Sequence, residues 1–120
     1  MPKIIDLPTF SDQRGNLTVI EKILPFEVNR VFLLHEIKDS RGGHGHIECK
    51  LALIALSGQV EVYCQTPTSD SRHLLDSPSK CLLLDPIDWH LIDKFSENVT
   101  LLALASHPYN KNDYFFEKYR

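Results

Sequence analysis

Short apolar or alternating segments, separated by turn residues at intervals of about ten residues, run along the whole chain. In one of them Val60, Val62 and Cys64 alternate with Glu61 and Tyr63, which is the two-residue period of a strand with one buried face. Almost nothing in the chain repeats with the period of a helix. The pattern therefore predicts an all-β fold, and a jelly-roll barrel fits it best.

Two segments, residues 51–56 and 99–105, are apolar on both faces, which is typical of central strands. A hairpin is predicted near the N-terminus, where the turn-forming residues 11–16 precede the β-rich segment 17–21. At the other end, the polar and aromatic segment 107–120 is interpreted as containing a short terminal helix that packs on the outside of the sheets.

The length and the charge of the chain restrict its class. With 120 residues it is expected to form a single domain, residues 1–120, whose core needs no disulfide or metal for stability. A net charge of −3 and a pI near 6.0 provide no basic surface for nucleic acid or for an anionic membrane. We therefore expect neither as a partner, although one or two local arginines suffice to bind a phosphorylated ligand.

The cysteines give no sign of an oxidising compartment. Cys49, Cys64 and Cys81 are odd in number and lack CxxC spacing, so we expect reduced, buried thiols rather than a disulfide framework or a zinc knuckle. The N-terminus lacks a basic segment followed by an apolar one, and no apolar run approaches the length of about 18 residues that spans a membrane. A cytoplasmic location is therefore expected.

The segment 41–46, Arg-Gly-Gly-His-Gly-His, has the composition of a site rather than of a core. On an extended strand His44 and His46 lie on one face, and Glu48 follows on that face. The glycines leave the opposite face bare, so that a ligand or a second backbone segment can come close. Two imidazoles on one wall are suited to acid/base chemistry near neutral pH.

Further candidate residues lie at turns. Residues 85–88 form a turn into a strand that carries Trp89 and His90. In a barrel, an inward-facing His90 would meet the two histidines of segment 41–46 in the apolar interior. Arg14, at the tip of the predicted hairpin, is a candidate for contacting a phosphate.

A set of short motifs covers nearly the whole chain in a defined order: Ile5-Asp6-Leu7-Pro8, Asp12-Gln13-Arg14-Gly15-Asn16-Leu17-Thr18, Pro25-Phe26, Arg30-Val31, Arg41-Gly42-Gly43-His44-Gly45-His46, Leu56-Ser57-Gly58, Trp89-His90, Phe95-Ser96, Leu101 to Ser106, and Asp113-Tyr114. In this order and spacing they resemble the cupin sugar ketoisomerases of the FdtA and WxcM-like group. The resemblance implies a small cupin jelly roll, usually a homodimer that exchanges N-terminal strands.

The resemblance also implies an activity. Members of this group convert a dTDP-4-keto-6-deoxyhexose into its 3-keto isomer, without a required metal or other cofactor. The conversion removes the C3 proton, passes through an enediol and delivers a proton to C4, so it needs a base and an acid near neutral pH. The resemblance assigns these roles to His44 and His46, and leaves open which of the two is the base.

The remaining site residues follow from the resemblance and from residue chemistry. Arg14 and Arg41 are the candidates for the nucleotide diphosphate, because a guanidinium fork matches phosphate oxygens. Trp89 and His90 are expected to line the cavity beside the sugar.

The chain departs from the family pattern at several positions. Gly45, Ile47 and Leu51 stand where the family has alanine, lysine and glutamine. Residues 32–35, Phe-Leu-Leu-His, lack the family's tyrosines, whose hydroxyl groups can bind or protonate the sugar. His35 is the candidate replacement, because its ring can donate or accept a hydrogen bond on the same strand.

Three alternatives stay open at this point. His44, His46 and His90, with Glu48, are also a ligand set for a metal-dependent cupin that binds Fe, Mn, Ni or Zn. The loss of the family's tyrosine, lysine and glutamine suits a non-catalytic cupin that only binds nucleotide sugars. Epimerisation at the same sugar requires the same proton abstraction, and the sequence does not separate it from isomerisation.

Overall fold

The structure is a computed structural model that describes residues 1–120, and it consists almost entirely of antiparallel strands. The elements in chain order are β1 (Lys3–Asp6), β2 (Thr9–Asp12), β3 (Gly15–Thr18), β4 (Arg30–His35), β5 (Arg41–His46), β6 (Leu51–Ser57), β7 (Val60–Gln65), β8 (Asp70–Leu75), β9 (Lys80–Leu84), β10 (Trp89–Phe95), β11 (Thr100–Ala105), η1 (Lys111–Asp113) and β12 (Tyr114–Phe115).

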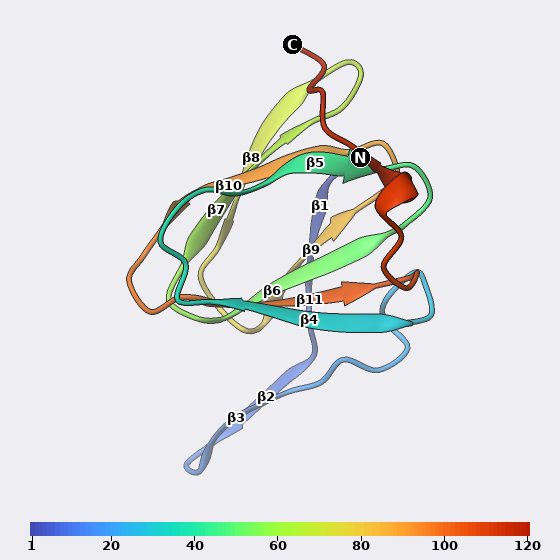
Figure 1. Ribbon diagram of the computed structural model, residues 1–120. Helices are drawn as coiled ribbons and strands as arrows, with labels where there is room; N and C mark the ends of the chain where they lie inside the picture. The colour runs from blue at the N-terminus through green and yellow to red at the C-terminus, as the bar shows by residue number, and fades with distance from the viewer.

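Two five-stranded sheets face one another and form a barrel (Figure 1). One sheet has the strand order β1-β9-β6-β11-β4, and the other has the order β12-β5-β10-β7-β8. Most neighbours within a sheet are far apart in the sequence, which is the arrangement of a jelly roll. The predicted all-β jelly-roll barrel is confirmed.

The two segments that are apolar on both faces lie side by side in the first sheet as β6 and β11. Leu53 and Ala103 are partners in this ladder and belong to the main core between the sheets. Ile54 and Leu104 belong to a second buried cluster, against which Ile23, Leu24 and Phe26 pack. A second apolar layer therefore explains why these strands are hydrophobic on both faces.

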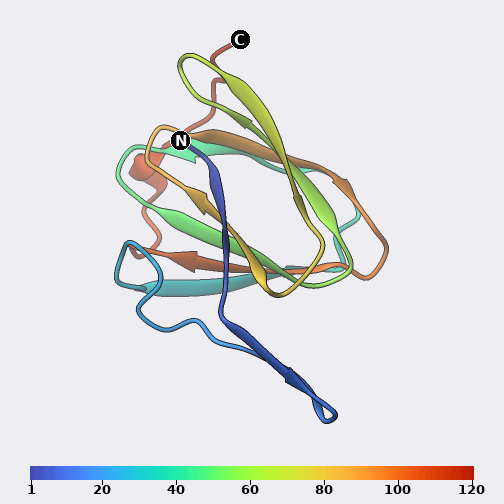
Figure 2. The same ribbon diagram turned by 180° about the vertical axis from the view of Figure 1, so that it is seen from behind.

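An N-terminal hairpin is present, formed by β2 and β3, and extends away from the barrel (Figures 1 and 2); its turn is shorter than the predicted residues 11–16, because Asp12 already pairs with Gly15. Seven of its eight strand residues are exposed, and only Thr18 is half-buried. Phe10 and Leu17 are cross-strand partners, and each leaves 63% of its surface exposed. The preceding strand β1 pairs with β9 of the same chain, so the free apolar surface lies on the hairpin.

The C-terminal segment is less helical than the sequence suggested. Only Lys111–Asp113 forms a 3₁₀ turn, and Tyr114–Phe115 forms the strand β12. This strand pairs with β5, where Tyr114 lies opposite His46 and Phe115 opposite Gly45. Backbone groups on the free side of β5 favour an extended partner, so the segment extends the sheet instead of packing on it as a helix.

Cys49, Cys64 and Cys81 are buried and unpaired, as expected. Burial raises the pKa of the Cys64 thiol to about 12 and that of the Cys81 thiol to about 11, so both remain protonated near neutral pH. None of the helical segments has the length and apolar character needed to span a membrane.

Candidate active site

A cavity of about 180 Å³ lies between the two sheets. Strands β4, β5, β6, β10 and β12 all contribute to its wall. Its lining consists of Arg30, Phe32, Leu34, Arg41, Gly42, His44, His46, Leu51, Leu53, His90, Ile92 and Tyr114. Three histidines, two arginines and one tyrosine therefore share a space whose other walls are mostly apolar.

The structure brings the three predicted histidines together. His44 and His46 both line the cavity from β5, and their ring centroids are 5.3 Å apart with the planes nearly perpendicular. His90 on β10 is the ladder partner of His44, and the two ring centroids are 4.8 Å apart. The alternation along β5 and the register with β10 thus place three imidazoles on adjoining walls.

Two glycines of β5 permit close approach at this point. Gly42 has φ +90°, and a Cβ atom there would lie 3.0 Å from the carbonyl oxygen of His90. A Cβ atom on Gly45 would overlap the ring of Phe115 and lie 2.7 Å from the carbonyl oxygen of Asp88. The ring of Phe115 therefore occupies the space that a side chain at position 45 would need.

Burial keeps two of the histidines neutral. The pKa of His44 is lowered to about 4, mainly by desolvation and to a smaller extent by the nearby His46. The pKa of His90 is lowered to about 3, mainly by desolvation and to a smaller extent by His44 and His46. The Nδ1 atom of His90 is buried without a hydrogen-bond partner, so no acceptor is in place there to stabilise a protonated ring.

His46 differs from the other two because it contacts a carboxylate. Its Nδ1 lies 3.2 Å from Oδ2 of Asp113, and the exposed fractions of the two side chains are 7% and 11%. Asp113 also accepts hydrogen bonds from the backbone N–H groups of Glu48 (2.8 Å) and Cys49 (3.2 Å). Burial lowers the pKa of His46, while the hydrogen bond and the charge of Asp113 act in the opposite direction.

Tyr114 is a cavity residue to which sequence reasoning gave no role. Its ring centroid lies 4.4 Å from that of His46 and 4.8 Å from that of His44. It brings an aromatic hydroxyl group to the cavity from β12, whereas the sequence led us to look for one on β4. The only sequence signal for Asp113 and Tyr114 was their presence among the motifs of the resemblance.

Two arginines line the cavity without neutralising partners. Arg41 lies there as predicted, and Arg30 is a second arginine that sequence reasoning did not assign. None of the ion pairs involves either residue. The guanidinium carbon of Arg30 lies 4.4 Å from the ring centroid of Phe32 and 5.3 Å from that of Tyr109. Stacking on aromatic rings orients a cation while its charge stays available for an anionic ligand.

Three other expected site residues lie outside the cavity. His35 is exposed on β4, where the alternation places it on the opposite face from Arg30, so it does not replace the missing tyrosine. Arg14 lies at the hairpin tip and pairs with Asp12 at 2.6 Å. Trp89 is buried, but its Nε1 donates to the carbonyl oxygen of Phe116 and its side chain packs away from the cavity lining.

The structure also bears on the metal-dependent alternative. Glu48 is exposed and does not line the cavity. One group of side chains has its potential ligand atoms close enough together to hold a metal ion, within 4.8 Å of one another. It consists of His46, Cys49 and Asp113, and not of the three cavity histidines. Asp113 Oδ2 already accepts a hydrogen bond from the Cys49 backbone N–H and lies 3.2 Å from His46 Nδ1. These contacts fit a histidine–carboxylate pair better than a metal centre.

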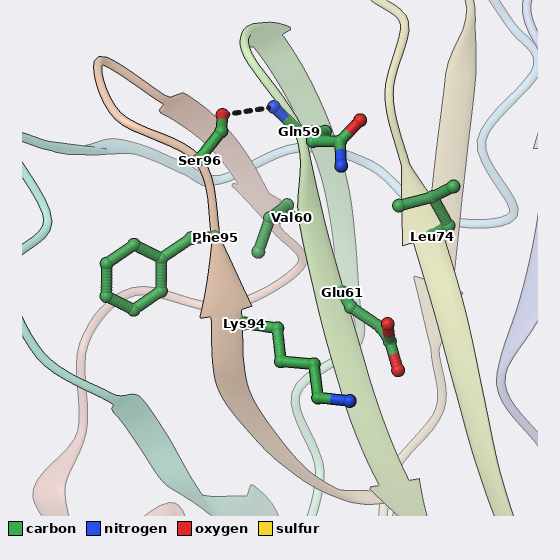
Figure 3. Close-up of a pocket in the computed structure, with 7 residues that line it drawn as sticks. All are labelled: Gln59, Val60, Glu61, Leu74, Lys94, Phe95 and Ser96. Carbon is green, nitrogen blue, oxygen red and sulfur yellow. Dashed lines mark hydrogen bonds between the residues drawn. The ribbon is translucent and has the colours of Figure 1, made fainter.

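A separate depression of about 270 Å³ is lined by Gln59, Val60, Glu61, Leu74, Lys94, Phe95 and Ser96 (Figure 3). The hydroxyl group of Ser96 accepts a hydrogen bond from the backbone of Gln59 at its rim. It shares no lining residue with the histidine cavity. It also contains no histidine, so the acid/base candidates lie in the other cavity.

Comparison with known proteins matches the whole chain. The family model described as "FdtA: WxcM-like, C-terminal" covers residues 1–120. A TDP-4-oxo-6-deoxy-alpha-D-glucose-3,4-oxoisomerase from Aneurinibacillus thermoaerophilus is 32% identical over an alignment of 126 positions, which covers 98% of this chain and 91% of that protein.

Solved structures agree with the sequence comparison. The sugar 3,4-ketoisomerase QdtA from Thermoanaerobacterium thermosaccharolyticum, in complex with TDP, has a TM-score of 0.91 at 33% identity, covering 97% of this chain and 88% of that one. A histidine-to-asparagine variant of QdtA has been solved with TDP-4-keto-6-deoxyglucose. The 3,5-epimerase RmlC from Legionella pneumophila, with a TM-score of 0.80 at 14% identity over 96% of this chain and 71% of its own, shares the fold.

Buried neutral histidines predict how stability depends on pH. In the unfolded chain, His44 and His90 take up protons as the pH falls below 6.5. In the folded chain, His44 takes up its proton only near pH 4 and His90 only near pH 3. The free energy of unfolding should therefore fall by about 1.5 kcal/mol for each of these histidines between roughly pH 6.5 and pH 5. Urea unfolding at both pH values measures the effect. The double variant His44→Asn/His90→Asn should lose this part of the pH dependence, and an unchanged dependence would contradict the assignment.

Proposed function

The chain belongs to the family described as FdtA, WxcM-like C-terminal, and on this premise we propose that it is a sugar-nucleotide 3,4-ketoisomerase. Its substrate is a dTDP-linked 4-keto-6-deoxyhexose, whose keto group moves from C4 to C3. The observation that carries the proposal is the histidine cavity, in a chain matched over nearly its full length by 3,4-ketoisomerases.

The proposed reaction uses groups that line the cavity. A base removes the proton on C3, the C3–H electron pair forms a C3=C4 double bond, and the C4 oxygen takes a proton to give an enediol. The C3 hydroxyl then loses its proton, its oxygen becomes the new carbonyl, and C4 gains a proton. The reaction is redox-neutral within the sugar, so acid/base groups suffice and no external oxidant or reductant is required. His44 and His46 are the proposed pair.

The other cavity residues suit the charge that develops. An enediolate carries negative charge on the sugar oxygens, and Arg30 offers a guanidinium that no carboxylate neutralises in the same cavity. Neutral His90 and the hydroxyl group of Tyr114 are suited to hydrogen bonds with sugar hydroxyl groups. Arg41, which lines the same cavity, is the proposed contact for the nucleotide diphosphate.

The hairpin suggests how the protein assembles. A two-stranded hairpin is at best marginally stable alone in water, and this one exposes the paired side chains of Phe10 and Leu17. Strand β4 lies at the edge of its sheet and exposes Val31 and Leu33 on its outer face. These features support a homodimer in which each β2–β3 hairpin packs on the other protomer. Arg14, at the hairpin tip, would then contribute to substrate binding only across this interface.

Isomerase activity is tested by incubating the protein with TDP-4-keto-6-deoxyglucose in deuterated water and following the sugar protons by NMR. The proposal predicts a 3-keto product with deuterium at C4. His44→Asn and His46→Asn should each reduce the rate by about 10²-fold or more, because they remove a proton-transferring group.

Each other result of this experiment overturns the proposal. Exchange at C3 without isomerisation would indicate an epimerase-like site, and TDP binding without exchange would indicate a binding module. Full activity in both histidine variants would remove these residues from their assigned roles. His73→Asn is the matched control, because His73 lies on β8, outside the cavity.

The diphosphate contact predicts an effect on binding rather than on chemistry. Arg41→Ala should weaken TDP binding by about tenfold or more in isothermal titration, because a charge-assisted hydrogen bond contributes roughly 1.5–3 kcal/mol. Arg72→Ala is the control, since Arg72 is paired with Asp93 and does not line the cavity. An unchanged affinity for Arg41→Ala would exclude this residue from the phosphate site.

The assembly predicts a mass of about twice 13.8 kDa in light scattering at micromolar concentration. Phe10→Ser/Leu17→Ser should shift the mass to that of the monomer, because it removes the apolar surface of the hairpin. Leu74→Ser, an exposed leucine on β8, is the control and should leave the dimer intact. A monomeric wild-type protein would contradict the proposed assembly.

A further inference from the structure

The segment that follows β12 is held on the barrel by polar contacts rather than by burial. Residues 116–120, here called the strap, are all exposed. They reach the loop between β7 and β8, residues 66–69, beside which they lie in both views (Figures 1 and 2). An exposed segment with few buried apolar contacts opens easily unless other contacts hold it. The hydrogen bonds of the strap therefore decide how firmly it is held.

Arg120 binds the β7–β8 hairpin through its whole guanidinium group. Nε donates to Oδ1 of Asp70 at 2.7 Å, and Nη1 donates to the carbonyl oxygen of Pro67 at 3.1 Å. Nη2 donates to the carbonyl oxygens of Thr66 and Ser69, both at 2.7 Å. A planar fork with donors in fixed directions matches such a set of acceptors, which the single ammonium group of a lysine does not.

Gln65, the last residue of β7, is a buried polar side chain whose acceptor is satisfied by the strap. It is 2% exposed, and its Oε1 accepts hydrogen bonds from the backbone N–H groups of Tyr119 (2.9 Å) and Arg120 (3.2 Å). Its Nε2 donates to the hydroxyl group of Tyr63 at 2.7 Å. A buried carboxamide without partners is costly, so displacement of the strap would leave Oε1 unsatisfied.

Asp70 joins these contacts into one network. Its Oδ1 accepts from Arg120, and its Oδ2 accepts from the hydroxyl group of Tyr63 at 2.6 Å. The hydrogen bonds from Tyr63 and from Arg120 lower the pKa of Asp70, so the carboxylate stays ionised near neutral pH. Gln65 and Arg120, here called the clasp, thus hold the strap through linked contacts, and the loss of either weakens the other.

The strap connects the clasp to the cavity. The carbonyl oxygen of Phe116 accepts a hydrogen bond from Nε1 of Trp89 at 3.1 Å. The ring of Phe116 stacks on that of Tyr114, with the centroids 6.2 Å apart and the planes inclined by 16°. Tyr114 in turn lies against His44 and His46. The clasp itself does not line the cavity, so the position of Tyr114 depends on contacts made outside it.

We propose that Gln65 and Arg120 are positioning residues for the isomerisation, which hold the strap and thereby keep Tyr114 against the two histidines of β5. The inference rests on the proposed ketoisomerase function and deepens it, because it adds two residues outside the cavity on which turnover depends. Misplacement of a cavity wall by about 1 Å can cost catalysis roughly 10²-fold. Diphosphate binding should be spared, because its proposed contact, Arg41, lies on β5.

The variant Arg120→Ala tests the proposal in the full chain. We expect kcat to fall by about tenfold or more, while the affinity for TDP changes less than about threefold. Gln65→Met, which removes the carboxamide and keeps a side chain of similar length, should act in the same way. In a Tyr114→Ala background, Arg120→Ala should lower kcat by less than a further threefold or so, because it acts through the position of Tyr114.

Trp89 reports directly on the strap. It is the only tryptophan of the chain, so its indole N–H gives a single cross-peak in ¹H–¹⁵N NMR. In Arg120→Ala this resonance should move toward the shift of a solvent-exposed indole, while the backbone amides of β6 keep their wild-type shifts. A fall in kcat with an unchanged Trp89 resonance would overturn the proposal, and so would equal changes in both sets of signals.

Arg72→Ala is the matched control. Arg72 lies on β8 of the same hairpin, and its side chain is 42% exposed against 41% for Arg120. It contacts the ring of Tyr63 and pairs with Asp93, so its removal loosens the hairpin and leaves the contacts of the strap in place. Both kcat and the Trp89 resonance should match the wild type. A loss of kcat equal to that of Arg120→Ala would show that the hairpin alone is responsible, and would overturn the proposal.

The possible failures are distinguishable. If the wild-type protein shows no isomerisation, the proposed function fails, while the Trp89 resonance still tests whether Arg120 holds the strap. If isomerisation occurs and Arg120→Ala retains the wild-type kcat, only the role of the clasp fails. If Gln65→Met does not fold, Arg120→Ala decides alone, because truncation of an exposed side chain leaves no cavity in the core.

Discussion

The desolvation of three imidazoles between the sheets, with His46 and His90 buried and His44 half-buried, is the constraint on which the rest of the site depends. A buried imidazolium without an acceptor is costly, so the rings stay neutral unless a carboxylate is supplied. His44 and His90 meet this requirement by remaining neutral, and Asp113 supplies the carboxylate for His46. The local backbone follows from the same arrangement, since Gly42 is needed where β5 passes over His90.

The C-terminal segment forms part of the cavity wall. Its strand β12 pairs with β5 and brings Asp113 and Tyr114 to His46. Farther along, Phe116 accepts a hydrogen bond from Trp89, and the backbone N–H of Tyr119 donates to Gln65. A segment fixed at several points holds the cavity wall more precisely than a free tail would, and in enzymes a displacement of about 1 Å can cost catalysis roughly 10²-fold.

Much of the fold follows from local pattern, whereas half of the site does not. The two-residue alternation and the glycines of segment 41–46 are local, so they predicted the barrel and the shared face of His44 and His46. Asp113 and His46 are 67 residues apart in the sequence, and no local pattern in the polar, aromatic C-terminal segment predicts their contact. The expectation for His35 failed for a reason that the sequence already contained: counted from Arg30, the period of two places His35 on the outer face.

The account centres on one claim, that the hexose binds between the sheets with C3 and C4 beside His44 and His46. A crystal structure of the His46→Asn variant with TDP-4-keto-6-deoxyglucose tests this most directly. The account predicts the hexose ring in the histidine cavity, with C3 and C4 facing positions 44 and 46 and the diphosphate at Arg41. A hexose bound outside this cavity, or one whose C3 and C4 face away from positions 44 and 46, would contradict it.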